Sequence, residues 1–384
     1  MIPQKIKLLI YYTTYEISSE AMRSVPGLIA SLITYLEKDI EIDFFTFNEN
    51  YNDHEIKTKP IFIGINKKER IFKRIKKSFF HKGFGNSEFK RFLVDKYLAK
   101  HHGHYHFILS LRMPDLDKLK SMYPDSELIF WFHDLTLLNS PDMKMNINNA
   151  DHVITPSITS YYRIQRFVEP HALTSKWHYI GNWVNEIFSA TIVENTELLK
   201  RKYAILPNTK IFIFSGGDLK FKGGHIIFTA FKEISLQLVH NTILFYAGQL
   251  SKAPEIQFGK LRIIFVGNLL PVELAAHYNL AQFGFLPSLG YDHSPLTLLE
   301  LIHAGVMPLA SNVGGVWEIL GKEYPFFVDF PNSVSAWSEL INKVLDQPET
   351  LRMSIVQGLV QKISSTHDSK MNKEKFKKII SAKS

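Results

Sequence analysis

The sequence predicts an α/β protein made of two similar halves, each a series of buried strands that alternate with helices. Short apolar runs that suit strands, such as Lys7–Thr13 and Ile211–Ser215, are followed by a helical pattern and then by another apolar run. This order begins again after a polar, irregular segment at about Tyr179–Phe188. The length of 384 residues agrees with two or three domains. Two such halves imply a cleft between them, which is a common place for a ligand.

The periodicity of apolar residues places the individual elements. Apolar residues at helical spacing indicate helices, and compact apolar runs bounded by turn residues indicate strands. A further helix is expected in the lysine-rich segment Ser369–Lys378. The predicted strands are Lys7–Thr13, Ile40–Phe47, Phe107–Leu111, Leu128–Phe132, His152–Thr155, Ile211–Ser215, Thr242–Ala247, Arg262–Gly267, Phe283–Pro287 and Met307–Ser311, and the predicted helices are Arg23–Leu36, Gly224–Leu238, Val272–Tyr278 and Pro295–Ala304.

The composition limits the class of protein. A hydrophobic content of 45% is sufficient for large cores. The absence of cysteine excludes disulfides, thiolate nucleophiles and cysteine metal sites, and it fits a reducing compartment. No apolar run reaches the length of about 18 residues that a membrane-spanning helix needs, and the run Leu8–Tyr12 is too short for a signal-peptide core. We therefore expect a cytoplasmic protein.

The basic charge suggests an anionic partner. The formal net charge is +8, and eight lysines and arginines fall within residues 67–82. On a helix, Ile71, Phe72, Ile75 and Phe79 would share one face and the basic residues would cover the rest. We expect this segment to attach the protein to an anionic membrane, at the inner face of the cytoplasmic membrane, and we expect no nucleic acid partner. The alternative is a surface helix that packs its apolar stripe on its own domain.

The most informative ligand-binding candidate is the helix Pro295–Ala304, which follows a strand. Ser294 is expected to cap this helix through its hydroxyl, and Gly305 lies just past its end. The free backbone N–H groups of Leu296 and Thr297 then point to the carboxyl edge of the sheet, together with the positive end of the helix dipole. Phosphates bind at this kind of position.

Two acidic residues accompany this helix. Glu300 lies about five residues into the helix, roughly 8 Å along its axis, which is about the distance from a diphosphate to a ribose. Its carboxylate stands in an apolar run and is costly to bury without partners, which ribose hydroxyls would supply. Asp292 precedes the helix and would lie near the sugar beyond the phosphates. The alternative is that Glu300 pairs with a nearby lysine and that Asp292 is a turn residue.

A second candidate loop follows the strand at Ile211–Ser215. The segment Ser215–Gly224 holds four glycines together with Lys220 and Lys222. Such a loop lets backbone and ammonium groups approach a diphosphate closely, although a plain surface turn has the same composition. The Gly-Gly turn within Asn312–Glu318, again after a strand, is another phosphate-edge arrangement.

Taken together, these residues resemble the retaining glycosyltransferases of family 4 (group 1), which have the GT-B fold. The resemblance is good from about Ile211 to Leu320 and thinner elsewhere. It implies two Rossmann-like domains that face a central cleft, with the acceptor bound by residues 1–184 and the nucleotide-sugar by residues 185–365. Residues 366–384 would form a C-terminal helix that packs back on the N-terminal domain.

The resemblance also implies roles for individual residues. Lys222, Asp292 and His133 would be catalytic, with His133 at a strand end that faces the donor sugar. The lysines would neutralise the charge that grows on the leaving diphosphate, so that neither a metal ion nor a cofactor is implied. The implied donor-binding residues are Gly217, Lys220, Lys222, Gly267, Asn268, Leu269, Ser294, Leu296, Thr297 and Glu300.

The expected function is retaining transfer of a hexose-type sugar from a nucleotide-diphosphate sugar to a glycan or lipid-linked acceptor. Bacterial surface polysaccharide or lipopolysaccharide synthesis is the expected setting. The sequence departs from the family where Thr14–Ser19 replaces its Gly-Gly loop and where Asp292 replaces its usual glutamate. The alternatives are a GT-B nucleotide-sugar epimerase or phosphorylase, and a non-enzymatic basic α/β protein that binds membrane or nucleic acid.

Two further patterns resemble metal sites. Asp115-Leu-Asp117 resembles the Asp-x-Asp signature of the other glycosyltransferase fold, and we interpret it as a solvated helix start because no strand leads directly into it. Four histidines lie within residues 101–106, but neither cysteine nor an obvious carboxylate accompanies them. We therefore expect no metal site.

Overall fold

The chain forms two compact units in a computed structural model. The N-terminal unit comprises Met1–Pro156, Tyr161–Ile180 and Lys373–Ser384, and the C-terminal unit comprises Ser157–Ser160 and Gly181–Asn372. The chain passes from one to the other at residues 180–181, near the division predicted at residue 184. The described residues are 5–12, 17, 24–64, 86–101, 103–133, 147–167, 176–189, 193–217, 220–248 and 253–382.

The basic segment 67–82, which we expect to bind a membrane, lies outside the described residues. The same is true of Thr14–Ser19, apart from Ile17. Within the described parts of the chain, no helix combines the length and the apolar character needed to cross a bilayer.

The N-terminal unit is built on a parallel sheet with the strand order β2-β1-β5-β6-β7-β8. Its strands read as nearly continuous apolar runs because both faces of a parallel sheet are covered. Leu9, Ile108 and Leu128, on three neighbouring strands, are fully buried in one hydrophobic core. The elements are β1 Lys7–Tyr11, α1 Ser24–Leu36, β2 Glu41–Asp43, β3 Phe45–Thr46, β4 Ile61–Phe62, α3 Asn86–Leu98, β5 Phe107–Ser110, η1 Met113–Asp115, α4 Leu116–Met122, β6 Glu127–Trp131, β7 His152–Thr155, α6 Ile158–Phe167 and β8 Lys176–Tyr179.

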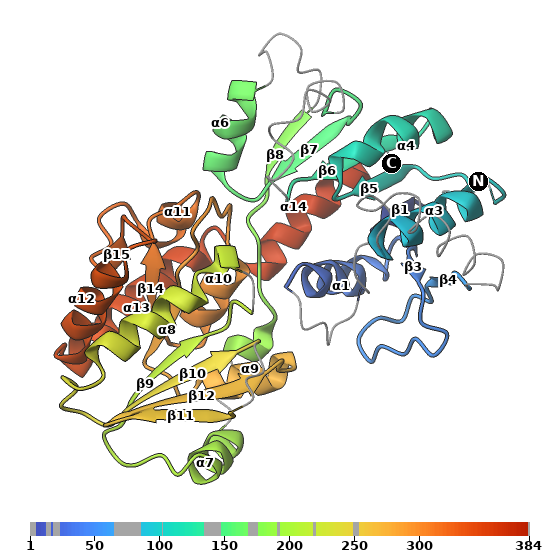
Figure 1. Ribbon diagram of the computed structural model, residues 1–384. Coiled ribbons are helices and arrows are strands. Elements are labelled where there is room, and N and C mark those ends of the chain that lie inside the picture. Colours follow the sequence, from blue (N-terminus) through green and yellow to red (C-terminus); the bar gives the residue numbers. More distant parts are fainter. Residues whose placement is uncertain are drawn as a thin grey trace, which may run out of the picture. The chain divides into compact units, whose positions relative to one another are not determined.

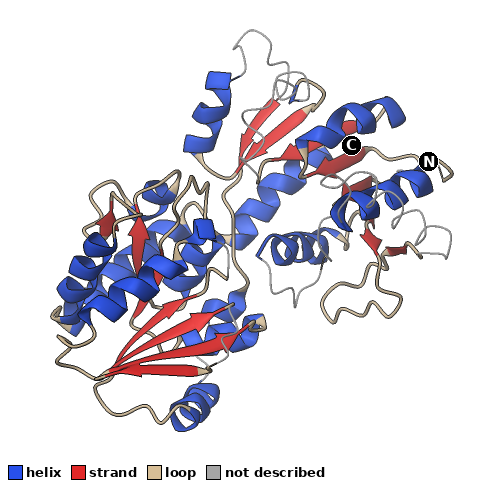
Figure 2. Ribbon diagram, viewed as in Figure 1, coloured by secondary structure: helices blue, strands red, loops and turns tan. Residues whose placement is uncertain are grey.

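The C-terminal unit holds a seven-stranded sheet with the order β11-β12-β10-β9-β13-β14-β15 (Figures 1 and 2). All its pairs are parallel except that of β11 with β12. Helix α8 packs on α12, and α10 packs on α13 and β14. The elements are η3 Glu186–Ser189, α7 Val193–Lys202, β9 Lys210–Phe214, η4 Lys220–Lys222, α8 Gly224–Ile234, β10 Thr242–Ala247, β11 Glu255–Phe258, β12 Leu261–Gly267, α9 Pro271–Tyr278, β13 Phe283–Leu286, α10 Leu296–His303, β14 Met307–Ser311, α11 Val316–Leu320, β15 Phe327–Val328, α12 Val334–Leu345 and α13 Glu349–Ser364.

The last helix, α14 (Ser369–Ser381), belongs to the N-terminal unit from Lys373 onward. Within that unit Lys377 forms an ion pair of 2.7 Å with Asp39, and the ring of Phe376 lies 5.8 Å from that of Trp131. Both an apolar and a charged contact therefore fix this end of the chain.

Two predictions about local structure are wrong. The segment Ile40–Phe47 is not one strand: β2 joins the main sheet, whereas β3 leaves it and pairs with β4 in a separate two-stranded sheet. Asp115 does begin a helix, but it is only 3% exposed and is not solvated. Its carboxylate lies 3.1 Å from the guanidinium of Arg91, so an ion pair supports it where we expected water.

The strand order creates a switch point in each sheet. In the N-terminal sheet the chain runs from β1 to β2 on one side and then places β5 on the other side of β1. In the C-terminal sheet it runs from β9 to β10 and β12, and then places β13 on the other side of β9. Ligands of open α/β sheets bind beyond the carboxyl ends of the strands at such points.

Candidate functional site

The two predicted donor-binding loops meet at the switch point of the C-terminal sheet. The lysine loop, Ser215–Gly224, follows β9 and is described apart from Asp218 and Leu219; the acidic loop, Pro287–Ser294, follows β13. The backbone N–H of Leu289 donates a hydrogen bond of 2.8 Å to the carbonyl of Phe221, which ties one loop to the other. Neighbouring parallel strands thus bring together two segments about 70 residues apart.

Lys222 and Asp292, both predicted to be catalytic, form an ion pair at this point. The Lys222 Nζ lies 3.0 Å from Asp292 Oδ2, and the two side chains are 29% and 17% exposed. The Ser288 hydroxyl donates to the same carboxylate oxygen at 3.4 Å. An ammonium group and a carboxylate are therefore held together in a partly solvated position, where both can contact a polar ligand.

Glycines bring the backbone close to this edge. Gly217 and Gly248 follow β9 and β10, Gly267 is the last residue of the adjacent strand β12, and all three have positive φ angles. The N–H of Gly248 donates to the carbonyl of Gly267 at 2.6 Å, and a Cβ on Gly248 would lie 2.5 Å from the Cα of Gly217. Sequence analysis predicted Gly217 and Gly267 but missed Gly248, whose signal is its position directly after an apolar strand.

Asn268 and Leu269, which the resemblance assigns to the nucleobase, continue from the end of β12. Asn268 is exposed and Leu269 is half-buried. Lys220 is exposed in the lysine loop. These three residues therefore lie on the same sheet edge as the two loops, with side chains that a ligand can reach.

Glu300 is a buried carboxylate with little support from the protein. It is 8% exposed, and burial raises its pKa to about 7. The hydroxyl of Tyr278 donates to Glu300 Oε2 at a long distance of 3.4 Å, and that hydroxyl also lies 2.7 Å from Ser215 Oγ. Within the described residues no lysine forms an ion pair with Glu300, so the alternative of a lysine partner finds no support.

Sequence analysis did not identify Tyr278 or Ser215 as partners of Glu300. Tyr278 is fully buried at the end of α9, and burial next to Glu300 raises its pKa well above the usual range. A tyrosine at the end of an apolar helical pattern predicts that the ring packs in the core, but it does not predict the hydrogen-bond partner of the hydroxyl. The chain Ser215–Tyr278–Glu300 links the lysine loop to α10.

The start of α10 differs from the prediction in one respect. Ser294 does not cap the helix: Pro295 occupies the capping position, and no side chain accepts there. The carbonyl of Ser294 accepts instead from Asn182 Nδ2 at 2.8 Å. The first N–H groups with a helical acceptor are those of Leu298 and Leu299, both bonded to the carbonyl of Pro295.

The N–H groups of Leu296 and Thr297 have no acceptor within the described residues, as the sequence predicts. They stand in the first turn of α10, directly after the acidic loop, where the helix dipole is positive. An anion in this position would receive two backbone hydrogen bonds.

The Gly-Gly turn after β14 packs against the backbone of the acidic loop and fixes its position. The N–H of Gly315 donates to the carbonyl of Asp292 at 2.7 Å. A Cβ on Gly314 would lie 2.1 Å from the carbonyl oxygen of Asp292, and one on Gly315 would lie 1.8 Å from that of His293. The glycines are thus required for close packing on the backbone of Asp292 and His293, which positions the acidic loop.

His133 lies in the N-terminal unit, directly after β6. Its ring is 5.1 Å from that of Trp131, and its Nε2 is buried without a hydrogen-bond partner among the described residues. Burial lowers the pKa of His133 to about 4, so the imidazole is neutral near pH 7. A neutral imidazole can donate or accept a hydrogen bond but contributes no positive charge.

The residues that the structure describes hold no candidate metal site. Across the described part of the chain, no three side chains among histidine, aspartate and glutamate cluster in a way that could hold a metal ion. Two of the described histidines in the segment 101–106 make other contacts: His106 Nδ1 accepts from the backbone N–H of Lys7 at 3.1 Å, and His101 Nδ1 lies 3.1 Å from the carbonyl of Tyr97.

Known proteins resemble this chain in the C-terminal sequence and in the whole fold. Residues 195–358 match the family model of glycosyl transferases group 1. Comparison with curated protein sequences gives no match. Sucrose-phosphate synthase from Thermosynechococcus elongatus superimposes with a TM-score of 0.72 at 16% identity, over 98% of both chains.

Two other solved structures are similar over the same extent. HepE of Anabaena, in complex with UDP and glucose, gives a TM-score of 0.70 at 14% identity over 98% of this chain and 100% of its own. The UDP-forming trehalose-phosphate synthase of Burkholderia vietnamiensis gives 0.72 at 12% identity, over 98% and 97%. These likenesses confirm the predicted GT-B fold with its two Rossmann-like units. The fold and the match over residues 195–358 together support a glycosyltransferase with the GT-B fold.

Proposed function

We propose that the protein is a retaining glycosyltransferase of family 4 that moves a hexose-type sugar from a nucleotide-diphosphate sugar to a glycan or lipid-linked acceptor. The observation that carries the proposal is the edge of the C-terminal sheet, where the Lys222–Asp292 pair directly precedes α10, the helix that carries the buried and poorly compensated carboxylate of Glu300. Lys222 and Asp292 are partly exposed and Glu300 has one long hydrogen bond, so a nucleotide-sugar can supply further polar contacts to all three.

The donor fits this edge in one direction. Its diphosphate would lie between the lysine loop and the free N–H groups of Leu296 and Thr297. Glu300, one turn further along α10, would accept hydrogen bonds from the ribose hydroxyls. Its carboxylate has acceptor capacity for them because its hydrogen bond from Tyr278 is long, at 3.4 Å. The base would then lie along residues 267–269 at the end of β12.

Lys222 would act on the leaving group and Asp292 on the sugar. The acceptor hydroxyl oxygen bonds to the anomeric carbon on the face from which the diphosphate departs, and the diphosphate takes the electron pair of the broken bond. The hydroxyl proton passes to a leaving phosphate oxygen. Lys222 and Lys220 would stabilise the charge that develops there, which makes a divalent cation unnecessary.

His133 would contribute as a neutral hydrogen-bonding group to the donor sugar, because its lowered pKa of about 4 keeps the ring uncharged. Two structural neighbours support a hexose and a uridine nucleotide: HepE forms a complex with UDP and glucose, and the trehalose-phosphate synthase is UDP-forming. We propose surface polysaccharide or lipopolysaccharide synthesis, at the inner face of the cytoplasmic membrane, as the setting.

The test is proton NMR of the purified protein with UDP-glucose in the presence of EDTA, in which slow donor hydrolysis needs no known acceptor. We expect release of UDP together with α-glucose as the first anomer, and loss of both in Lys222→Ala. Release of β-glucose would contradict retention, and dependence on added Mg²⁺ would contradict the metal-independent mechanism. An epimerised sugar nucleotide would instead identify the protein as an epimerase.

A further inference from the structure

The switch point of the N-terminal sheet carries a group of charged residues that the proposed donor chemistry does not use. Tyr11 is the last residue of β1, and Ser110 is the last residue of the adjacent strand β5. Arg112 stands two residues after the end of β5, and Arg91 comes from α3. This position corresponds to the one where open α/β sheets bind their ligands.

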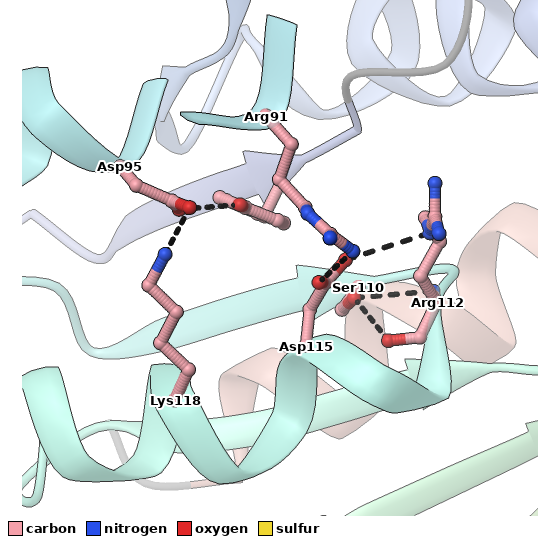
Figure 3. A network of polar contacts seen from close by, with 7 residues as sticks. Arg91, Asp95, Ser110, Arg112, Asp115 and Lys118 are labelled. Carbon is pink, nitrogen blue, oxygen red and sulfur yellow. Dashed lines mark hydrogen bonds and ion pairs between the residues drawn. The ribbon is translucent and has the colours of Figure 1, made fainter. Parts of the chain in front are cut away.

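The carboxylate of Asp115 forms ion pairs with both arginines (Figure 3). Its carboxylate is 4% exposed; Oδ1 lies 3.1 Å from Arg91 Nη1, and Oδ2 lies 3.7 Å from Arg112 Nε. The first contact is a hydrogen-bonded ion pair, whereas the second is too long for a hydrogen bond. The two guanidinium groups are therefore gathered over one buried carboxylate.

A second carboxylate completes the network. Asp95 accepts a hydrogen bond of 2.6 Å from the hydroxyl of Tyr11 and forms an ion pair with Lys118. Figure 3 shows Asp95 and Arg91 side by side on α3, with Lys118 reaching across from α4. Among the described residues of this network, three cationic side chains thus meet two carboxylates.

The arginines are both accessible and fixed. Their side chains are 29% and 26% exposed, although the carboxylate between them is buried. The Ser110 hydroxyl accepts from the N–H of Arg112 at 3.2 Å and donates to its carbonyl at 3.1 Å, so the backbone of Arg112 is held at the strand end. A guanidinium fork in a fixed position suits an oxyanion because it can donate two parallel hydrogen bonds.

We propose that Arg91 and Arg112 bind an anionic phosphate group of the acceptor. The inference rests on the proposed function in that it assigns the acceptor to a chemical class, but the site itself is independent of the donor residues. The phosphate of a soluble sugar phosphate and that of a lipid-linked sugar share this chemistry.

A purely structural role is the competing explanation, in which the network only fastens α3 to the sheet. In that case Arg112→Ala would lower the stability of the protein and leave its affinity for phosphate unchanged. Affinity for the anion is therefore the decisive measurement.

The experiment is isothermal titration of inorganic phosphate into the full-length protein carrying Lys220→Ala and Lys222→Ala, which removes anion binding by the lysine loop. In this background we expect Arg112→Ala to weaken phosphate binding by about tenfold or more, because a charge-assisted bidentate contact is lost. Arg112→Lys should recover part of the affinity. Arg166→Ala, an exposed arginine in the last turn of α6, is the matched control and should bind as the background does.

Circular dichroism checks that each variant is folded, and Arg112→Gln, which keeps a polar hydrogen-bonding end on a shorter side chain without the charge, replaces Arg112→Ala if the latter is not. Failure of the background protein to bind phosphate, or equal binding by the Arg112 variants, would overturn the proposal. Nucleotide binding by the unmodified protein is measured in parallel, so that failure of the donor site is recognised separately. Tighter binding of glucose 6-phosphate than of geranyl phosphate would support a soluble acceptor, and the reverse order would support a lipid-linked one.

Discussion

The carboxyl edges of the two sheets have the same topology but opposite electrostatic designs. At the C-terminal edge, glycines open the backbone and Glu300 is buried with one long hydrogen bond. At the N-terminal edge, the buried carboxylate of Asp115 has two arginines, and Asp95 has a tyrosine hydroxyl and a lysine. One edge is left incomplete and the other is nearly neutralised by its own side chains.

This difference indicates that the C-terminal edge is less stable without a ligand than the N-terminal edge. A buried acid with a raised pKa destabilises the folded chain unless a ligand completes its hydrogen bonds. At the N-terminal edge burial also raises the pKa of Asp115, but the positive charges of Arg91 and Arg112 oppose that shift and so reduce its cost. The changes that follow test this contrast, from the largest expected effect to the smallest.

Lys222→Ala should have the largest effect. It removes the ammonium group at the leaving diphosphate, and we expect kcat for donor turnover to fall about 100- to 1000-fold, as for other preorganised electrostatic groups. Lys232→Ala, an exposed lysine in the last turn of α8, removes the same charge from the same unit and should leave kcat unchanged. Equal rates for the two variants would remove Lys222 from the mechanism.

Replacing glycines at the C-terminal edge should separate packing from binding. Both Gly223 (φ +71°) and Gly217 (φ +69°) are left-handed, but a Cβ on Gly223 would lie 2.0 Å from the Pro287 carbonyl, whereas one on Gly217 would meet nothing within 4 Å. Urea denaturation should show a loss of about 2–4 kcal/mol for Gly223→Ala and about 1 kcal/mol for Gly217→Ala. Similar losses would show that the loop relaxes.

Glu300→Gln should change how stability depends on pH. The folded pKa of about 7 lies above the ordinary 4.5, so the folded state binds the proton more tightly than the unfolded state does. The free energy of unfolding contributed by this group is therefore highest below about pH 4.5, falls as the pH rises towards 7, and is level above it.

The variant lacks this titration, so at about pH 8 it should be more stable than the natural protein by of order 1–3 kcal/mol, and the two should converge near about pH 5. Thermal unfolding of both proteins across this range measures the difference. A constant difference at every pH would show that Glu300 titrates normally.

The smallest effect concerns the start of α10. Ser294→Ala should change the free energy of unfolding by about 0.5 kcal/mol or less, because its hydroxyl caps no N–H group and makes only one long contact, 3.5 Å to His367 Nε2. Ser333→Ala at the start of α12 is the comparison: its hydroxyl accepts from the N–H of Ala336 at 3.2 Å, and its loss should cost about 1 kcal/mol. A larger effect at Ser294 would mean that the first turn of α10 is not left open for a ligand.

Five strands of the C-terminal sheet could be predicted from the sequence to within one residue of their bounds, whereas β11 and β15 were missed. The bounds of β10 and β14 agree with the prediction because buried parallel strands are uninterrupted apolar runs. Strand β8, KWHY, was missed because it is partly exposed and mostly polar, with no alternation to mark it. Element type is thus predictable where burial is complete, and poorly predictable at the edges of a sheet.

The chemistry of the candidate site could be predicted as residue types but not as contacts. Glycine and lysine composition identified the lysine loop, yet its ion pair with Asp292 depends on which strands become neighbours. The burial of Asp115 was missed for the same reason: a local pattern of charged residues looks solvated until α3 supplies Arg91. Contacts between residues far apart in the sequence decide both the Lys222–Asp292 ion pair and the burial of Asp115, and the local periodicity of the sequence does not encode such contacts.

The central claim is that the edge holding Lys222 and Glu300 binds a nucleoside diphosphate. The direct test is the thermal shift of the full-length protein with UDP, GDP and ADP, repeated with Glu300→Ala. A ligand at a hundred times its dissociation constant should stabilise the protein by about 2.7 kcal/mol. We predict that one diphosphate raises the melting temperature and that the variant loses this shift; no shift with any of the three, or an equal shift in the variant, would contradict the account.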